Sequence, residues 1–124
     1  MPDEKLYWPF ETADAPYQIP LEPAEFGFLE QAHREGFSPH KLPISNYGAS
    51  SPAGRVAYII VRGRVRREVW LGADDEKVGS LYVDSFDAAA DAALRWLRGD
   101  AFASVGDAVR EHIVVMPGAM RPGP

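Results

Sequence analysis

The sequence predicts an α+β fold: a small antiparallel sheet of three to five strands with helices packed on one face. Two runs rich in β-branched and aromatic residues, 56–61 and 65–71, are separated by a connection of hairpin length. An alanine-rich segment at 86–98 has the apolar spacing of an amphipathic helix. A chain of 124 residues, 46% of them hydrophobic, is long enough for one domain with its own core.

The proline and aromatic content of residues 1–21 predicts an extended arm that precedes the domain. Pro9, Pro16 and Pro20 stand among its aromatic residues, and proline fixes φ and donates no backbone hydrogen bond. Its aromatic residues, among them Trp8 and Phe10, predict that the arm packs on something. Two interpretations stay open: the arm lies over its own core, or it forms an edge that a partner covers.

Residues 22–116 are expected to form the single domain, beginning with a helix at 23–35. Pro23 suits the first helical position and Gly36 suits the stop. The spacing places Phe26, Leu29, Ala32 and His33 on one face. Residues 37–54 are expected to be mostly loop, with a short strand at 42–45 and turn chemistry over 46–54.

The hairpin follows at 56–61 and 65–71. In its second strand Val69 and Leu71 should point to one side, and Glu68 and Trp70 to the other. Residues 72–79 are expected to be a polar loop, and 81–83 a third strand.

The helix at 86–98 has the clearest start and stop signals. Asp84 or Ser85 is the expected N-cap, and Gly99 is the expected stop. Its predicted apolar stripe includes Leu94 and Leu97, which should cover the sheet. A second helix is expected over about 104–113, opened by Ser104. Residues 113–116 suggest a short strand or packed coil, and 117–124 a flexible tail.

Composition and charge restrict the classes of function. With no cysteine the chain has no disulfide, no thiolate zinc site and no cysteine nucleophile, which fits the cytoplasm, our expected location. We expect no membrane contact, since the longest apolar run, of about six residues, is far shorter than a membrane span. The net charge of -5 does not suit general nucleic-acid binding, so we expect no nucleic-acid partner. Residues 31–72 carry seven bases and two acids, whereas 1–30 and 73–100 carry seven acids each, a distribution that suits a charged protein partner or a solvated surface.

No pattern in the sequence is a catalytic signature, and we expect neither an enzyme nor a cofactor. Asp84, Asp87 and Asp91 share a helical face, but an N-cap and a solvated surface explain them. The three histidines, His33, His40 and His112, lack metal-ligand spacing.

Two charged loops and the arm are the candidate binding residues. The hairpin tip could contact an acidic protein patch, could contact nucleic acid, or could simply be solvated. The turn at 74–76 could help to hold a cation, although it lacks the alternating oxygen ligands of a calcium loop. The candidate residues are Arg62, Arg64, Arg66, Arg67, Asp74, Asp75, Glu76, Trp8 and Phe10.

Six short motifs occur in this order: Leu42-Pro43-Ile44, Asn46-Tyr47-Gly48, Tyr58-Ile59-Ile60-Val61-x-Gly63, Glu68-Val69-Trp70, Val83-Asp84-Ser85-Phe86 and Trp96-Leu97. Together they resemble the C-terminal half of SUKH domains. That superfamily includes bacterial immunity proteins of polymorphic toxin systems and fungal cell-wall regulators. The resemblance covers residues 42–98. Typical members open with one or two helices bearing a Leu-Pro motif, whereas this chain has the proline-broken arm and one predicted helix.

The resemblance implies a SUKH-like fold and a domain that binds a protein, such as a toxin, without a cofactor or catalytic residues. The alternative is a structural or adaptor subunit of a larger bacterial or phage assembly, which the aromatic arm suggests. A small enzyme is the third and least favoured interpretation. A homodimer is left open.

Overall fold

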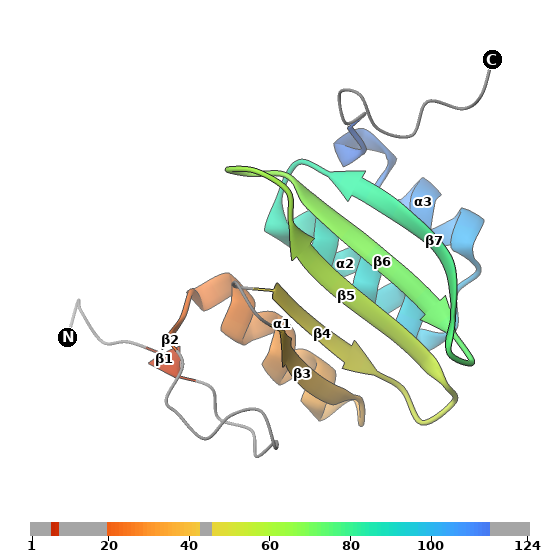
Figure 1. Ribbon diagram of the computed structural model, residues 1–124, viewed down its shortest axis with the longest axis horizontal. Coiled ribbons are helices and arrows are strands. Elements are labelled where there is room, and N and C mark those ends of the chain that lie inside the picture. Colours follow the sequence, from red (N-terminus) through yellow and green to blue (C-terminus); the bar gives the residue numbers. More distant parts are fainter. Residues whose placement is uncertain (1–5, 8–19, 43–45, 115–124) are drawn as a thin grey trace.

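The computed structural model describes residues 6–7, 20–42 and 46–114. Within these ranges a five-stranded antiparallel sheet packs on three α-helices, which confirms the predicted α+β class (Figure 1). Each strand of this sheet pairs with the next one in the sequence, in the order β3-β4-β5-β6-β7. The strands are β3 Ser38–Leu42, β4 Asn46–Ser50, β5 Arg55–Val61, β6 Arg67–Ala73 and β7 Glu76–Val83.

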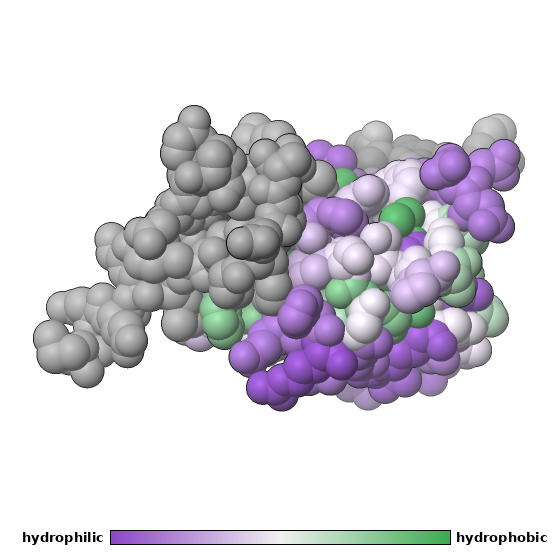
Figure 2. All heavy atoms as spheres, turned by 90° about the horizontal axis from the view of Figure 1, so that it is seen from below, coloured by the Kyte–Doolittle hydropathy of each residue, from purple (hydrophilic) through white to green (hydrophobic). Residues whose placement is uncertain are grey.

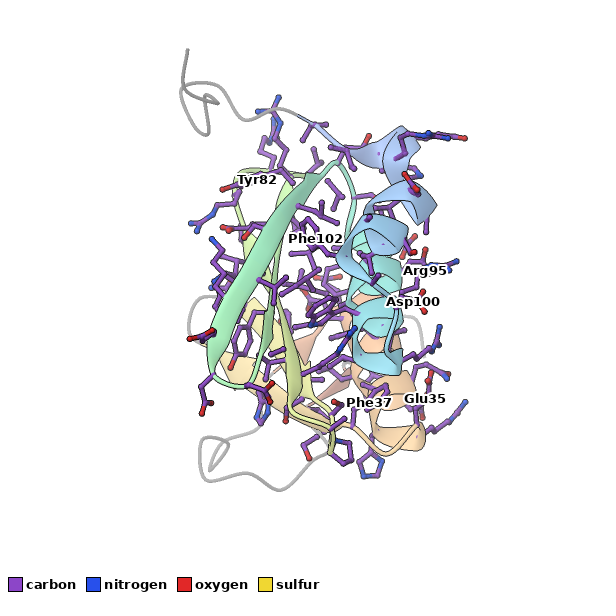
Figure 3. All side chains as sticks on the ribbon, turned by 90° about the vertical axis from the view of Figure 1, so that its right-hand side faces the viewer. Glu35, Phe37, Tyr82, Arg95, Asp100 and Phe102 are labelled. Atoms are coloured by element: carbon purple, nitrogen blue, oxygen red, sulfur yellow. The ribbon has the colours of Figure 1, made fainter. Side chains whose placement is uncertain are left out.

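The helices lie together on one side of the sheet, as the side view shows (Figure 3). The helix predicted near the N-terminus is α1, and the alanine-rich helix is α2. Two further short strands, β1 and β2, pair with each other. The bounds are β1 Leu6–Tyr7, β2 Pro20–Leu21, α1 Pro23–Arg34, α2 Phe86–Arg98, α3 Phe102–Ala108 and the 3-10 helix η1 Arg110–His112.

The core fills the space between the two layers. Ala57 and Ile59 of β5 and Val69 and Leu71 of β6 are buried because alternate side chains of each strand point towards the helices. The burial of Val69 and Leu71 confirms the alternation predicted for 69–71. Phe37 and Phe102 also lie between the layers in Figure 3. On the outside, hydrophilic residues form a band along the lower side of the view in Figure 2, with paler and hydrophobic residues above it.

Helix α2 begins and ends as its sequence predicts. The Ser85 hydroxyl accepts a hydrogen bond from the Ala88 amide at 3.1 Å, and Gly99 adopts a left-handed φ of 113° after the last turn. The buried stripe differs from the predicted one, because Ala92 and Trp96 are buried while Leu94 is only partly buried. The buried residues of α2 are Ala88, Ala89, Ala92, Ala93, Trp96 and Leu97.

On α1 the predicted apolar face is also partly wrong. Leu29 and Ala32 are buried as expected, but Phe28 joins them, whereas His33 is exposed and Phe26 is partly buried.

Three loop and helix predictions were wrong. Residues 37–54 contain β3 and β4, and of the turn predicted over 46–54 only 51–54 is a turn. Residues 43–45 of the predicted short strand lie outside the described part. Residues 72–79 form the end of β6 and the start of β7, joined by Asp74 and Asp75 with φ of 53° and 67°. Aspartate tolerates this left-handed conformation, so two residues are enough to reverse the chain.

The C-terminal helix begins at Phe102, two residues before the predicted Ser104, with Ala101 as its N-cap. It ends at Ala108 and is followed by η1. Ile113 then pairs with Val83 at the outer edge of β7; residues 115–116 lie outside the described part. Within the described ranges no helix has the length and apolar composition needed to cross a bilayer.

Candidate functional site: the open face of the sheet

The face of the sheet that points away from the helices, here called the open face, is not covered by any helix of the described part (Figure 3). Tyr82 lies on this face. One row of residues crosses it from β3 to β7, each residue directly opposite the next. This central row consists of His40, Gly48, Tyr58, Trp70 and Ser80.

The rings of Tyr58 and Trp70 form the centre of the row. Their centroids are 5.4 Å apart and their planes are tilted by 42°. Both side chains are partly exposed. A Cβ atom at Gly72 would lie 2.6 Å from Cζ3 of Trp70, and a Cβ atom at Gly48 would overlap the Tyr58 ring. The rings therefore lie over backbone positions that must have no side chain.

Glu68 lies beside the row and is only 4% exposed. Its carboxylate accepts hydrogen bonds from Nε of Arg62 at 2.9 Å and from Oγ of Ser80 at 2.7 Å. Burial by itself would raise the pKa of Glu68, but the bonds from Ser80 and Arg62 outweigh burial and hold the pKa below its ordinary value. The ionised Glu68 thus joins the end of β5 to β6 and β7.

The histidines lie in three different places. His40, in the central row, forms a hydrogen bond of 3.0 Å between Nε2 and Oγ of Ser50. His112 Nδ1 lies 3.0 Å from Oδ1 of Asp84 beside the outer edge of β7, and His33 is exposed on α1. Across the described ranges no group of three or more His, Cys, Asp or Glu residues is placed to hold a metal ion.

The carboxylates on the predicted helical face do not act together. Asp84 pairs with His112, Asp91 pairs with Arg95 at 3.1 Å, and Asp87 is exposed. Near them η1 lines a shallow polar depression that shares no residue with the central row; it is lined by Asp107, Ala108, Arg110, Glu111 and His112.

The two charged loops predicted as binding residues lie at opposite ends of β6. Arg62 to Arg66 connect β5 to β6, and Asp74 and Asp75 connect β6 to β7. Strand β6 has seven residues, so these loops are about 20 Å apart. They cannot bind one small ligand together. Trp8 and Phe10 lie outside the described residues.

The central row could not be recognised from the sequence. The alternation of β6 placed Glu68 and Trp70 on one face, which was right. Gly48, however, lies in a segment that reads as a turn because of its glycine, asparagine and serine content. Only the pairing of Gly48 with Tyr58 shows that this glycine belongs to a strand and leaves room for a ring.

Comparison with protein-family models, with curated proteins and with solved structures finds no match to this chain.

Proposed function

We propose that this chain is a non-catalytic protein-binding domain, similar to a SUKH-type immunity protein that binds and neutralises a toxin. The observation that carries the proposal is the pair of partly exposed rings, Tyr58 and Trp70, on a sheet face opposite the helices. Aromatic side chains surrounded by a polar rim are typical of the energetically important centre of protein interfaces.

The packing beneath the open face supports this proposal because it makes the face rigid before a partner arrives. Trp96 of α2 donates from Nε1 to the Gly72 carbonyl oxygen at 2.9 Å, and Arg55 of β5 donates to the Trp96 carbonyl oxygen at 2.9 Å. These bonds join α2 to β5 and β6. A surface that is ordered beforehand loses less entropy on binding.

The residues of the SUKH resemblance divide into two groups in the structure. Tyr47, Ser85, Phe86 and Trp96 serve the scaffold: Ser85 caps α2, and the rings of Tyr47 and Phe86 meet edge-on with centroids 6.4 Å apart. Tyr58 and Trp70 face outward on the open face. This division supports a shared scaffold that presents a binding surface.

Co-expression with the toxin domains encoded by neighbouring genes tests the proposal. We expect one of them to co-purify with the chain and its toxicity to be suppressed. The double variant Tyr58→Ser/Trp70→Ser should lose this protection, whereas Asp87→Ser, an exposed change on α2, should retain it. Circular dichroism and thermal melting establish that each variant is folded. If no neighbouring toxin domain co-purifies and none is suppressed, the immunity function is wrong.

A further inference from the structure

From the charges at the two ends of the open face, we infer that its partner is a protein segment of both signs. The partner carries acidic side chains at one end and basic side chains about 20 Å away, with an apolar or aromatic side chain between them. This inference rests on the proposed binding function and adds the partner's chemistry and orientation. The arginine end comprises Arg62, Arg64 and Arg66, and the acidic end comprises Asp74 and Asp75. Arg67 and Glu76 follow the alternation of β6 and β7 to the helix side of the sheet.

The geometry of β6 sets this order. The strand runs from Arg67 to Ala73, and Trp70 is its middle residue. The aromatic rings therefore lie about 10 Å from each end of the strand. A partner that covers the rings and extends along β6 must meet basic groups on one side and acidic groups on the other.

The arginine end is positive because its connection contains no acidic residue. Arg62 is neutralised by Glu68, with 2.7 Å between Nη2 and Oε1. Arg64, at the tip of the connection, is exposed. The neighbouring Val65 is 60% exposed and adds an apolar contact beside the charge.

The acidic end is held in place by backbone geometry. Asp74 and Asp75 both have positive φ, and the Asp74 amide donates to the Gly54 carbonyl oxygen at 3.0 Å. The carboxylates of Asp74 and Asp75 are exposed. Lys77, opposite Gly72 on the open face, reduces their negative charge without removing it.

The separation of the two ends decides between partner classes. At physiological ionic strength the screening length is about 8 Å, so each end acts on its own part of the partner. A phosphate backbone or a uniformly basic groove would be attracted at one end and repelled at the other. A protein surface with both signs is attracted at both.

Three synthetic nine-residue peptides test this inference without a known toxin. Each has Trp-Pro at its centre, and the flanks are acidic on one side and basic on the other, acidic on both sides, or basic on both sides. Titration of the isotopically labelled full chain, followed by nuclear magnetic resonance, reports the Trp70 indole and the backbone amides at both ends. We expect the two-sign peptide to bind most tightly and to shift all three regions.

Charge reversal at single positions makes the test specific. Arg64→Glu should weaken binding of the two-sign peptide by about two- to fivefold and move the preference towards the basic peptide. Asp75→Lys should weaken it similarly and move the preference towards the acidic peptide. Arg110→Glu, an exposed change on η1, is the matched control and should change neither.

The inference is overturned if the three peptides bind equally, if none binds, if one charge reversal has no effect, or if the shifts lie on the helices. A preference for the acidic or the basic peptide would replace the two-sign partner with a partner of that single sign. These outcomes are separate from toxin protection: protection without two-sign preference contradicts only this inference, and two-sign preference without protection contradicts only the immunity function.

Discussion

At the scale of single residues, Arg55 shows how a charged side chain can serve the core. It lies on β5, and its Nη1 donates to the carbonyl oxygens of Trp96 at 2.9 Å and Asp100 at 2.5 Å. Its guanidinium also lies 3.9 Å from the centroid of the Trp96 ring. The last carbonyl groups of a helix have no partner within the helix, and a cation is favoured there. Arg55 thus satisfies the end of α2 from a neighbouring strand.

Arg55 also illustrates a limit of sequence reasoning. In the sequence Arg55 lies only seven residues before Arg62 of the basic hairpin tip, but the structure places its guanidinium against Trp96 of α2, 41 residues away in the chain. Nothing in the local pattern distinguishes this arginine from the solvated ones, because the helix end that it contacts is brought to it only by folding.

Glu35 links the end of α1 to the end of α2 and predicts a pH dependence of stability. Hydrogen bonds from Arg98 first, at 2.7 and 2.6 Å, and from Gln31 second lower the pKa of Glu35 from 4.5 to about 2. A lowered pKa in the folded state stabilises the fold fully above pH 4.5, and this contribution is lost as the pH falls from 4.5 towards 2. Glu35→Gln should therefore cost stability at pH 7 and little at pH 2.

The expected cost at pH 7 is about 1 kcal/mol or less, because the Arg98 side chain is 44% exposed and solvent screens the pair. Urea denaturation at several pH values measures it. Glu30→Gln removes the same charge from a longer, exposed contact of 3.4 Å with Arg34 and is the control. If Glu35→Gln lowered the free energy of unfolding by the same amount at pH 7 and at pH 2, the role given to Glu35 would be contradicted.

At the scale of elements, the helices were easier to predict than the turns. Ser85, Gly99 and the terminal arginines of α2 are local signals that act within a few residues, and they gave the bounds of that helix correctly. Strands β3 and β4 carry few β-branched residues, so their pairing with neighbours rather than their propensity makes them strands. The start of β7 was missed because Glu76 and Lys77 look like part of a polar loop.

The orientation of α2 predicts different costs for two leucines of the same helix. Leu97 is 4% exposed, and Leu94 packs against the core but is only partly buried. Leu97→Ala should lower the free energy of unfolding by about 2–5 kcal/mol, the usual range for a core leucine. Leu94→Ala should cost clearly less. Denaturation by urea compares the two, and a larger loss for Leu94→Ala would mean that the helix is rotated relative to this description.

At the scale of the whole molecule, the open face exists only because five consecutive strands, spread over residues 38–83, lie side by side in one sheet. Tyr58 and Trp70 are visible in the sequence as aromatic residues of the two predicted hairpin strands, but the glycines beneath them were not visible as part of the same surface. Gly48 lies on β4 and leaves room for the Tyr58 ring, and Gly72 lies near the end of β6 and leaves room for the Trp70 ring. The fold was therefore predictable in class, and the candidate site was not.

Glycine substitution tests this arrangement with a control from the same chain. Gly48→Ala should destabilise the fold, because the new methyl group would overlap the Tyr58 ring and would lie 2.8 Å from the Ala57 carbonyl oxygen. Gly27→Ala is the control: nothing lies within 4 Å of a methyl group there, and alanine should stabilise α1 by about 1 kcal/mol.

Adding Tyr58→Ser to Gly48→Ala separates the two contacts of the new methyl group. Removing the ring leaves only the contact with the Ala57 carbonyl oxygen, so the methyl group should cost less in the Tyr58→Ser background than in the unmodified chain. Thermal melting of the four chains measures this difference. Equal costs in both backgrounds would mean that the ring does not lie over Gly48, and the central row would then lose the contact that orients Tyr58 towards Trp70.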